Sequence, residues 1–195
     1  NDALKIEQAG VALGEFANVK NAKEIFAALM LQLDNQMVEL NTSNGIYQPT
    51  LSVASSVSAK PAVQSLEFYS EFSDPVKDVY SWNKSMDNSA TAFISGDLAI
   101  YFGLMSEFDG IKAKNPNLNF DVAQLPQVKE LPTIITYADV YALAVPKTST
   151  KAQTALTIAS SLANGTAAAG IAGASGYAPV RRDLITAPNL SKYTK

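Results

Sequence analysis

One stretch of the sequence decides the expected fold: Phe93-Ile94-Ser95-Gly96-Asp97-Leu98-Ala99-Ile100-Tyr101-Phe102-Gly103. Residues 89–95 are typical of one or two helical turns, and Gly96 ends them because glycine adopts left-handed backbone angles without strain. Residues 98–102 are continuously apolar, which indicates a buried strand, and Gly103 ends that strand. A short helix followed directly by a buried strand indicates mixed α and β structure.

Two longer helices are expected before this stretch. In residues 21–40 apolar side chains recur every four positions, which predicts one long amphipathic helix. Residues 41–60 are rich in Ser, Thr, Asn and Gln without a clear period, which predicts a long exposed connection. A second helix opens near Pro61, since proline is favoured at the first helical position. Its expected inward side chains are Val63, Leu66, Tyr69 and Phe72.

Helices and strands continue to alternate after the stretch. Helices are expected at residues 104–114 and 150–162, and β-rich runs at residues 119–123 and 134–145. Residues 164–176 hold four glycines among alanines, but their spacing matches neither a dinucleotide fingerprint nor a phosphate loop. A close-packed helix followed by a turn is therefore the favoured interpretation. The expected inward side chains of residues 150–162 are Ala155, Ile158, Ala159 and Leu162.

Composition excludes several classes of function. The chain has 195 residues, 47% of them hydrophobic, which is enough to bury a core. Its 15 Lys and Arg against 18 Asp and Glu give a net charge of −3, so nucleic acid is an unfavoured partner. The absence of His and Cys removes imidazole-based metal sites, thiolate nucleophiles and His-dependent triads. We expect no cofactor, and binding needs none of the missing groups.

The carboxylates leave one enzymatic alternative open. Asp121 and Asp139 each interrupt a β-rich apolar run, so each points either to the outer face of a half-exposed sheet or into a polar cleft. A carboxylate-based enzyme would place two acids, drawn from Asp121, Asp139 and Glu107, opposite each other in a cleft.

Aromatic residues point instead to carbohydrate binding. Several of them sit near element ends and loops, where core packing is still the default interpretation. Flat apolar faces with a polar edge suit sugar rings, and carboxylates or Arg can bind the hydroxyls. Trp82 is the predicted stacking residue, and Arg181-Arg182 could supply a hydrogen-bonding fork or be a pair of solvated surface cations.

The order of motifs resembles that of a known family. The stretch that ends at Gly103 resembles the Phe-x-x-Gly-x-x-Ala-Met-x-x-x-Gly signature of extracellular solute-binding proteins of the sugar-binding, maltose-binding-protein-like class, with Ile100 in place of Met. Four further segments resemble that family in the same order. They are Ala9-Gly10-Val11-Ala12-Leu13-Gly14, residues 120–126, residues 142–146, and Gly176-Tyr177-Ala178-Pro179-Val180-Arg181-Arg182-Asp183-Leu184.

The resemblance implies one lobe of a periplasmic-binding-protein type II-like α/β fold, with a mixed sheet flanked by helices. Such proteins have two lobes joined by a hinge and close over a ligand in the cleft. On this pattern residues 1–132 and 166–195 form the second, C-terminal lobe. Residues 133–165 form a strand-helix excursion that belongs to the first lobe in relatives, and the rest of the first lobe is absent from this chain.

The resemblance also assigns contacts by position. Gly103, Leu104 and Met105 match a turn where relatives contact ligand, frequently through an aromatic residue that Met105 replaces here. Tyr137 and Asp139 match a second segment at the cleft edge. Tyr177 and Arg181 match a third. The expected contact set is Trp82, Gly103, Leu104, Met105, Tyr137, Asp139, Tyr177 and Arg181.

The implied function is non-enzymatic capture of a carbohydrate for an ABC-type importer. The partners are then a sugar and the importer's permease subunits. The location is extracellular or periplasmic, with a membrane tether through an N-terminal lipoprotein anchor that this chain lacks. Three alternatives stay open: a binding lobe for a peptide, polyamine or metal–chelate complex, the carboxylate-based carbohydrate-active enzyme, and an adhesion module with a broad exposed apolar patch.

Overall fold

The computed structural model describes residues 6–129 and 134–184. The chain divides into two compact units. Unit 1 comprises Asn1–Gly103 and Gln124–Tyr137, and unit 2 comprises Leu104–Ala123 and Ala138–Lys195. Helices and strands occur together, as expected for an α/β chain. In place of one mixed sheet, the described residues form two separate two-stranded sheets, both in unit 1.

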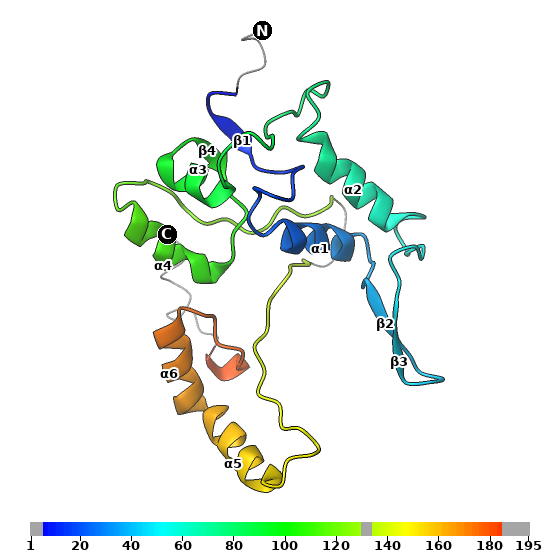
Figure 1. Cartoon of the computed structure of the whole chain (residues 1–195), viewed down its shortest axis with the longest axis vertical. Helices are drawn as coiled ribbons and strands as arrows, with labels where there is room; N and C mark the ends of the chain where they lie inside the picture. Colours follow the sequence, from blue (N-terminus) through cyan, green and yellow to red (C-terminus); the bar gives the residue numbers. More distant parts are fainter. Residues whose placement is uncertain (1–5, 130–133, 185–195) are drawn as a thin grey trace. The chain divides into compact units, whose positions relative to one another are not determined.

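The decisive stretch folds as its local chemistry predicts. Helix α3 (Ser89–Ser95) begins where the Asn88 side chain accepts a hydrogen bond from the next turn, and it ends at Gly96 with a φ of 93°. Strand β4 (Leu98–Ile100) follows and pairs in parallel with β1 (Ala9–Val11), as Figure 1 shows. The predicted helix and glycine stop are confirmed. The strand forms as well, but it is shorter than residues 98–102 and is not buried throughout, since Ile100 is 56% exposed.

The first long helix is much shorter than its periodicity predicts. Helix α1 (Ala22–Gln32) ends eight residues before Leu40, the last residue of the predicted helix. Asp34 and Met37 have positive φ angles of 57° and 62°, which no right-handed helix contains. The apolar spacing continued by chance into a turn and a strand, so the prediction of one helix over residues 21–40 was wrong.

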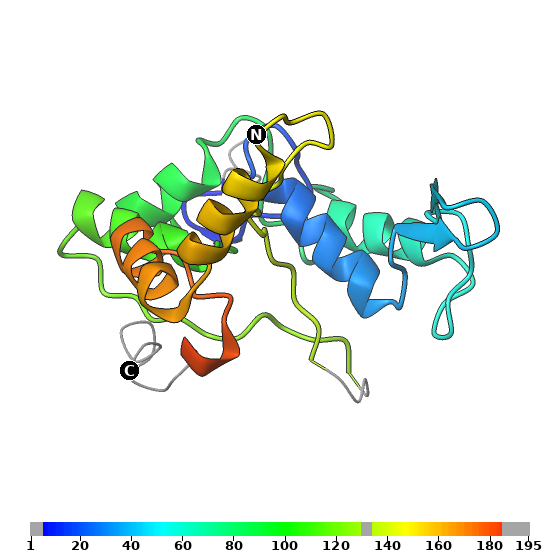
Figure 2. The ribbon, with the colours of Figure 1, turned by 90° about the horizontal axis from the view of Figure 1, so that it is seen from below.

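A hairpin occupies part of the expected connection. Strands β2 (Val38–Asn41) and β3 (Ile46–Pro49) pair antiparallel and project beyond the end of α1 in both views (Figures 1 and 2). A side chain and the backbone both stabilise the turn. Asn41 Oδ1 accepts from the N–H of Ser43, and the Asn41 carbonyl oxygen accepts from the N–H of Gly45 at 2.8 Å. Residues 41–60 are exposed at nearly every position, as predicted, but they are not without structure.

One buried side chain fixes the base of this hairpin. The Nδ2 of Asn35 donates to the carbonyl oxygens of Thr50, at 2.9 Å, and Val53, at 3.3 Å. Its Oδ1 accepts from the N–H of Met37 at 2.8 Å. These bonds tie the segments before and after the hairpin to each other, so Asn35 closes the loop.

Helix α2 (Pro61–Glu71) begins at proline as predicted and packs on α1 (Figures 1 and 2). Half of its predicted inward face is confirmed, because Tyr69 is buried and Phe72 packs against the core. Pro61, Ser65 and Tyr69 are buried, four residues apart, whereas Val63 and Leu66 are exposed. Steps of three drift by about 60° each around a helix, so the predicted row from Val63 to Phe72 spirals to the opposite side.

The described core lies in unit 1 around Trp82, which has 0% of its surface exposed. The indole Nε1 donates to Asn18 Oδ1 at 3.1 Å. The Asn18 Nδ2 donates in turn to the backbone oxygens of Asn83 and Met86, both at 2.9 Å. The segment that contains Asn83 and Met86 is therefore held by the half-buried amide of Asn18. The buried apolar cluster consists of Ala9, Ala12, Leu13, Val19, Ala22, Ile25, Tyr69, Trp82, Ala92 and Leu98.

Tyr69 makes this core sensitive to alkaline pH. Its hydroxyl donates to the Glu15 carbonyl oxygen at 2.8 Å, and burial, with the negative charge of Glu15, raises the pKa of Tyr69 to about 12. An unfolded tyrosine has a pKa of about 10, so the folded state holds this proton more tightly. The resulting stability is complete below about pH 10 and is lost as pH rises from there toward 12.

We therefore expect Tyr69→Phe to weaken the pH dependence of unfolding above about pH 10. Urea unfolding of both proteins at pH 8 and pH 11 measures it. At pH 8 the variant should lose about 1 kcal/mol with the hydrogen bond to Glu15, and the gap between the two proteins should narrow at pH 11. A gap that stays constant between the two pH values would contradict the raised pKa.

The regular elements described in unit 2 are helices. A 3-10 turn (Met105–Glu107) leads into α4 (Phe108–Lys114), and α5 (Ala152–Leu162) leads into α6 (Gly165–Ser175). These confirm the helices predicted for residues 104–114, 150–162 and 164–176. No described residue of α5 or α6 is buried, so the four side chains predicted to face inward from residues 150–162 do not do so in this structure.

Helices α5 and α6 meet at a bend of 69°. Among the described residues no single helix has the length and apolar composition of a membrane span, and α5 with α6 reaches that composition only as a bent pair.

The β-rich runs at residues 119–123 and 134–145 form no ladder within the described residues. Residues just after the first run are instead bound by a side chain of α1. Gln32 Nε2 donates to the Pro126 oxygen, and its Oε1 accepts from the N–H of Val128, each at 3.0 Å. A β-type composition makes a segment extended, but a strand also needs a neighbouring strand, so neither predicted strand forms among the described residues.

Candidate ligand-binding site

The predicted contacts divide between the two units. Trp82, Gly103 and Tyr137 belong to unit 1, and the other predicted contacts belong to unit 2. Those of unit 2 are Leu104, Met105, Asp139, Tyr177 and Arg181.

Trp82 does not present a ring face. Its side chain is fully covered by protein, and its N–H is used by Asn18. A stacking residue needs an accessible face, so in this structure Trp82 acts in packing. Phe93 and Tyr101 also stack on each other, with ring centroids 5.4 Å apart. Phe93 and Tyr101, which both belong to the decisive stretch, thus pack against the core.

The turn after Gly103 is fixed by its own chain. The N–H of Leu104 donates to Glu107 Oε2 at 3.1 Å, and the N–H of Glu107 donates to the Leu104 oxygen at 2.9 Å. Met105 is exposed beside them. Leu104 and Met105 are therefore held in a defined turn, and the Glu107 carboxylate is engaged in forming it.

Two tyrosines from segments far apart in the sequence meet in unit 2. The ring centroids of Tyr141 and Tyr177 lie 5.2 Å apart with their planes tilted by 38°. Tyr141 is 77% exposed and Tyr177 is 45% exposed. Gly176, with a φ of 73°, ends α6 directly before Tyr177 and turns the chain there. The pair offers aromatic surface to solvent, unlike the aromatic residues around Trp82.

A carboxylate acts on this tyrosine pair. Hydrogen bonding with the Tyr141 hydroxyl, the charge of Tyr141, partial burial and the negative charge of Asp139 raise the pKa of Tyr177. Tyr177 is therefore a neutral phenol at physiological pH. The charge of Asp139, another predicted contact, is the smallest of these effects on the pKa of Tyr177.

The predicted fork of Arg181 is already occupied. Its Nε donates to Asp183 Oδ1 at 3.0 Å and its Nη2 to Asp183 Oδ2 at 2.8 Å. Its Nη1 donates to the Ala163 oxygen at 3.3 Å. Hydrogen bonding and charge attraction with Asp183 raise the pKa of Arg181, and the same hydrogen bond with Arg181 lowers the pKa of Asp183. Arg181 thus ties the segment after Tyr177 to the end of α5, and the Arg182 side chain lies outside the described part of the structure.

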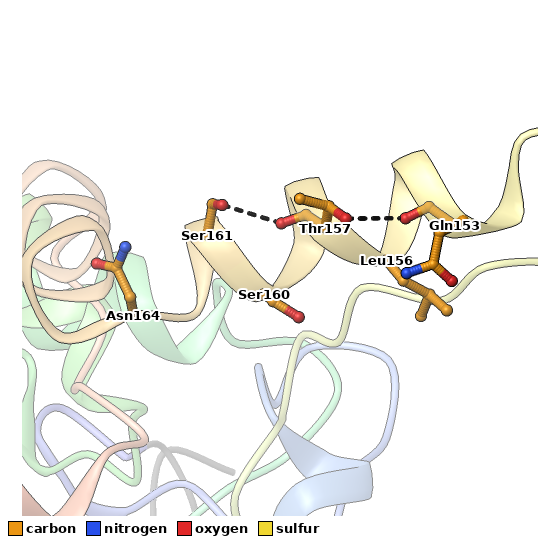
Figure 3. A pocket seen from close by; sticks show the side chains of 6 residues that line it. All are labelled: Gln153, Leu156, Thr157, Ser160, Ser161 and Asn164. Carbon is orange, nitrogen blue, oxygen red and sulfur yellow. Dashed lines mark hydrogen bonds between the residues drawn. The ribbon is translucent and has the colours of Figure 1, made fainter.

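A shallow hollow of about 430 Å³ follows one face of α5 (Figure 3). Two of its hydroxyls are used within the helix, since Thr157 donates to the Gln153 oxygen and Ser161 to the Thr157 oxygen. None of the predicted contacts lines it. The lining side chains are Gln153, Leu156, Thr157, Ser160, Ser161 and Asn164.

The acids named for an enzyme do not form a described catalytic pair. Asp121 is exposed and accepts from the N–H of Val122, and Asp139 is exposed in a different segment. No group of three or more acidic residues that could hold a metal ion occurs among the described residues.

Tyr141 is the residue that the predicted contact set omits. Tyr137, Asp139 and Tyr141 alternate along one β-rich run, so they share one face of an extended chain. That alternation is the sequence signal that could have added Tyr141 to the set. The contact with Tyr177, 36 positions later, has no signal in a single sequence.

A sequence model of one family, described as bacterial extracellular solute-binding protein, matches residues 5–195. No curated protein and no solved structure gives a significant match. The family has a periplasmic-binding-protein-like fold, is generally non-enzymatic, and works outside the cytoplasm with ABC transporter permeases and small-molecule ligands. The resemblance seen in the motifs is confirmed at this level, and because the match covers nearly the whole length, this chain belongs to the bacterial extracellular solute-binding protein family.

Proposed function

We propose that the protein captures a carbohydrate outside the cytoplasmic membrane and delivers it to an ABC-type importer by closure of a cleft between two lobes. The observation that carries the choice of carbohydrate is the exposed Tyr141–Tyr177 pair. The family supports capture of a solute, and the exposed tyrosine pair supports the proposal that the solute is a sugar.

The chemistry of the cluster matches a sugar ring. The C–H faces of a pyranose are apolar and pack on aromatic rings, and its hydroxyls donate hydrogen bonds to carboxylates. Tyr177 and Tyr141 supply aromatic rings that carry hydroxyl groups, and the Asp139 carboxylate supplies a hydrogen-bond acceptor. A purely apolar ligand would use the rings alone.

The proposed contact set follows the sequence prediction with two changes of role. Gly103, Leu104, Met105, Tyr137, Asp139 and Tyr177 remain proposed ligand contacts, and Tyr141 joins them. Trp82 is left out because its ring is covered. Arg181 supports the segment that carries Tyr177, since reaching a ligand with its fork would break its bonds to Asp183.

We propose that residues 1–132 and 166–195 are the second lobe and that residues 133–165 pack on a first lobe. The support is exposure: Val140, Leu143 and Ile158 are apolar side chains of this excursion that are more than half exposed. An apolar extended segment followed by an uncovered helix gains most from a neighbouring sheet. A first lobe before Asn1, preceded by a lipid-anchored N-terminus that tethers the protein to the membrane, would provide it.

Isothermal titration of the full protein with neutral oligosaccharides tests the function. We expect saturable binding of at least one of them with a dissociation constant on the order of 1 μM, about −8 kcal/mol. In the same protein, backbone amides in residues 134–145 should exchange slowly with solvent if the segment is paired in a first-lobe sheet. Fast exchange there would contradict the two-lobe arrangement.

A polyamine is the second candidate ligand, because the same cluster also fits a cation. An ammonium group can lie over a tyrosine ring while a carboxylate such as Asp139 balances its charge. Titration with spermidine under the same conditions separates the two. Tight binding of spermidine, together with no binding of any carbohydrate, would overturn the sugar proposal.

A further inference from the structure

We propose that Asn44 is a site of spontaneous covalent modification, at which the backbone nitrogen of Gly45 attacks the Asn44 side chain and converts it into aspartate and isoaspartate. The chain has two Asn-Gly pairs, Asn44-Gly45 and Asn164-Gly165. Glycine favours the reaction at both pairs, because it has no side chain that hinders the attacking nitrogen. The two pairs differ in the structure that surrounds them, and that structure selects the first.

The reaction consumes only water and releases ammonia. The Gly45 nitrogen forms a bond to Cγ of Asn44, the Cγ–Nδ2 bond breaks, and the proton of the Gly45 N–H leaves with Nδ2 as ammonia. Water then opens the resulting succinimide ring. Opening at Cγ gives aspartate, and opening at the backbone carbonyl carbon gives isoaspartate, whose backbone is one carbon longer. Either product adds one negative charge to a chain whose net charge is −3.

Asn44 lies at the exposed tip of the β2–β3 hairpin, which projects beyond the end of α1 (Figures 1 and 2). Its Oδ1 accepts a hydrogen bond from the N–H of Ile46 at 3.0 Å. That bond spans the Gly45 peptide, and it stabilises the negative charge that develops on Oδ1 during the attack. Apart from the neighbouring residues, no described atom lies within 4 Å of the position of a Cβ at Gly45, so the ring has room to form.

One hydrogen bond has to open before the Gly45 nitrogen can react. The N–H of Gly45 donates to the Asn41 carbonyl oxygen at 2.8 Å. Its release is a local event, because residues 42–45 are all exposed and the bonds of Asn35 hold the base of the hairpin. Exposed segments of this kind open at little cost in free energy.

The second pair is fixed at the start of a helix. Asn164 caps α6, where its Oδ1 accepts from the N–H of Ala167 at 3.0 Å and its backbone oxygen accepts from the N–H of Ala168 at 2.8 Å. Its side-chain carbonyl is therefore polarised by a backbone N–H, as at the first pair. Attack by the Gly165 nitrogen, however, would turn the side chain out of the cap and disturb the first turn of the helix.

Neighbouring side chains restrict the second pair further. Asp183 Oδ2 lies 3.9 Å, and Arg181 Nε 4.0 Å, from the position of a Cβ at Gly165. These two side chains bond to each other, and Arg181 also bonds to the oxygen of Ala163 at the end of α5. A ring that formed at the second pair would have to fit beside this ion pair. The same dipeptide should therefore react quickly in the hairpin and slowly at the helix.

Mass spectrometry of tryptic peptides from the full protein, incubated at pH 7, measures both rates in one sample, because cleavage after Lys and Arg separates Asn44 from Asn164. In the folded protein we expect conversion of Asn44 to be about tenfold faster than that of Asn164. In guanidinium chloride, which removes both the hairpin and the helix, the two rates should agree within about twofold. A ratio of about three or less in the folded protein, or the same ratio with and without denaturant, would overturn the proposal.

Two matched variants identify the modified residue. Asn44→Gln places the side-chain carbonyl one carbon farther out, so the hairpin peptide should no longer gain the mass of the conversion. Asn164→Gln is the control, and it should leave the rate in the hairpin peptide unchanged. Enzymatic methylation of isoaspartate in the wild-type hairpin peptide detects the second product. If that peptide still gains mass in Asn44→Gln, another residue is modified and the assignment to Asn44 is wrong.

Discussion

Replacing Trp82 by alanine is expected to lower the free energy of unfolding by about 3–5 kcal/mol. The indole is the largest fully buried side chain of the described core, and it has no exposed surface. Its removal leaves a cavity among Ala9, Leu13 and the rest of the buried cluster, and it leaves Asn18 Oδ1 without its donor. Both losses lie in unit 1, so the β1–β4 pair should unfold with them.

Urea unfolding followed by far-UV circular dichroism measures this loss, since the variant has no tryptophan left for fluorescence. Trp82→Phe is the matched variant: it keeps most of the packing and should lose about 1–2 kcal/mol with the Asn18 bond. Val76→Ala, at an 88% exposed site, should change stability by less than about 0.5 kcal/mol. Emission from the wild-type tryptophan at the wavelength of a solvated indole would contradict its burial.

Replacing Gly14 by alanine is expected to cost about 2–4 kcal/mol. Gly14 has a φ of 93°, and a Cβ there would lie 2.7 Å from the backbone nitrogen of Ser73. Relief would require a backbone shift, because the obstacle is not the end of a flexible side chain. That shift would break the hydrogen bond from the Ser73 hydroxyl to the Gly14 oxygen, now 3.1 Å.

Two other glycines separate the causes of this loss. Gly45 also has a positive φ, 69°, but nothing lies within 4 Å of a Cβ there. Gly45→Ala should therefore cost about 1 kcal/mol from strain alone. Gly110 lies inside α4 with open space around it, so Gly110→Ala should stabilise the protein by about 0.5–1 kcal/mol. Equal losses at Gly14 and Gly45, measured by urea unfolding, would show that contact with Ser73 is unimportant.

Local chemistry explains which parts of the fold the sequence predicts well. Gly96 and Pro61 act on their own backbone, so the end of α3 and the start of α2 follow from a few residues. The segment after Gln32 depends on the turn at Asp34 and Met37, where tertiary bonds of Asn35 override the apolar period. Strands at residues 119–123 and 134–145 depend on partners that no local pattern contains.

The candidate site also combines features that the local sequence predicts with features that depend on the rest of the chain. The sequence alone identifies Asp139 and Tyr177 as candidates through motif position, and the structure adds that Tyr141 meets Tyr177. The pairing of Arg181 with Asp183 was available locally, since the two residues are only two positions apart, and it changes Arg181 from a ligand fork into a support. Burial of Trp82 was not available, because exposure depends on the whole surrounding chain.

The hairpin gives this protein a natural place to carry added sequence. Asn35 closes its base, and the tip at Ser43, Asn44 and Gly45 is exposed on all sides. An exposed turn tolerates an insertion well when other hydrogen bonds, here those of Asn35, hold the base of its hairpin. An epitope or a small fluorescent domain placed between Ser43 and Asn44 would change no residue of the unit that holds Tyr141 and Tyr177, so the protein itself could be located in living cells by microscopy.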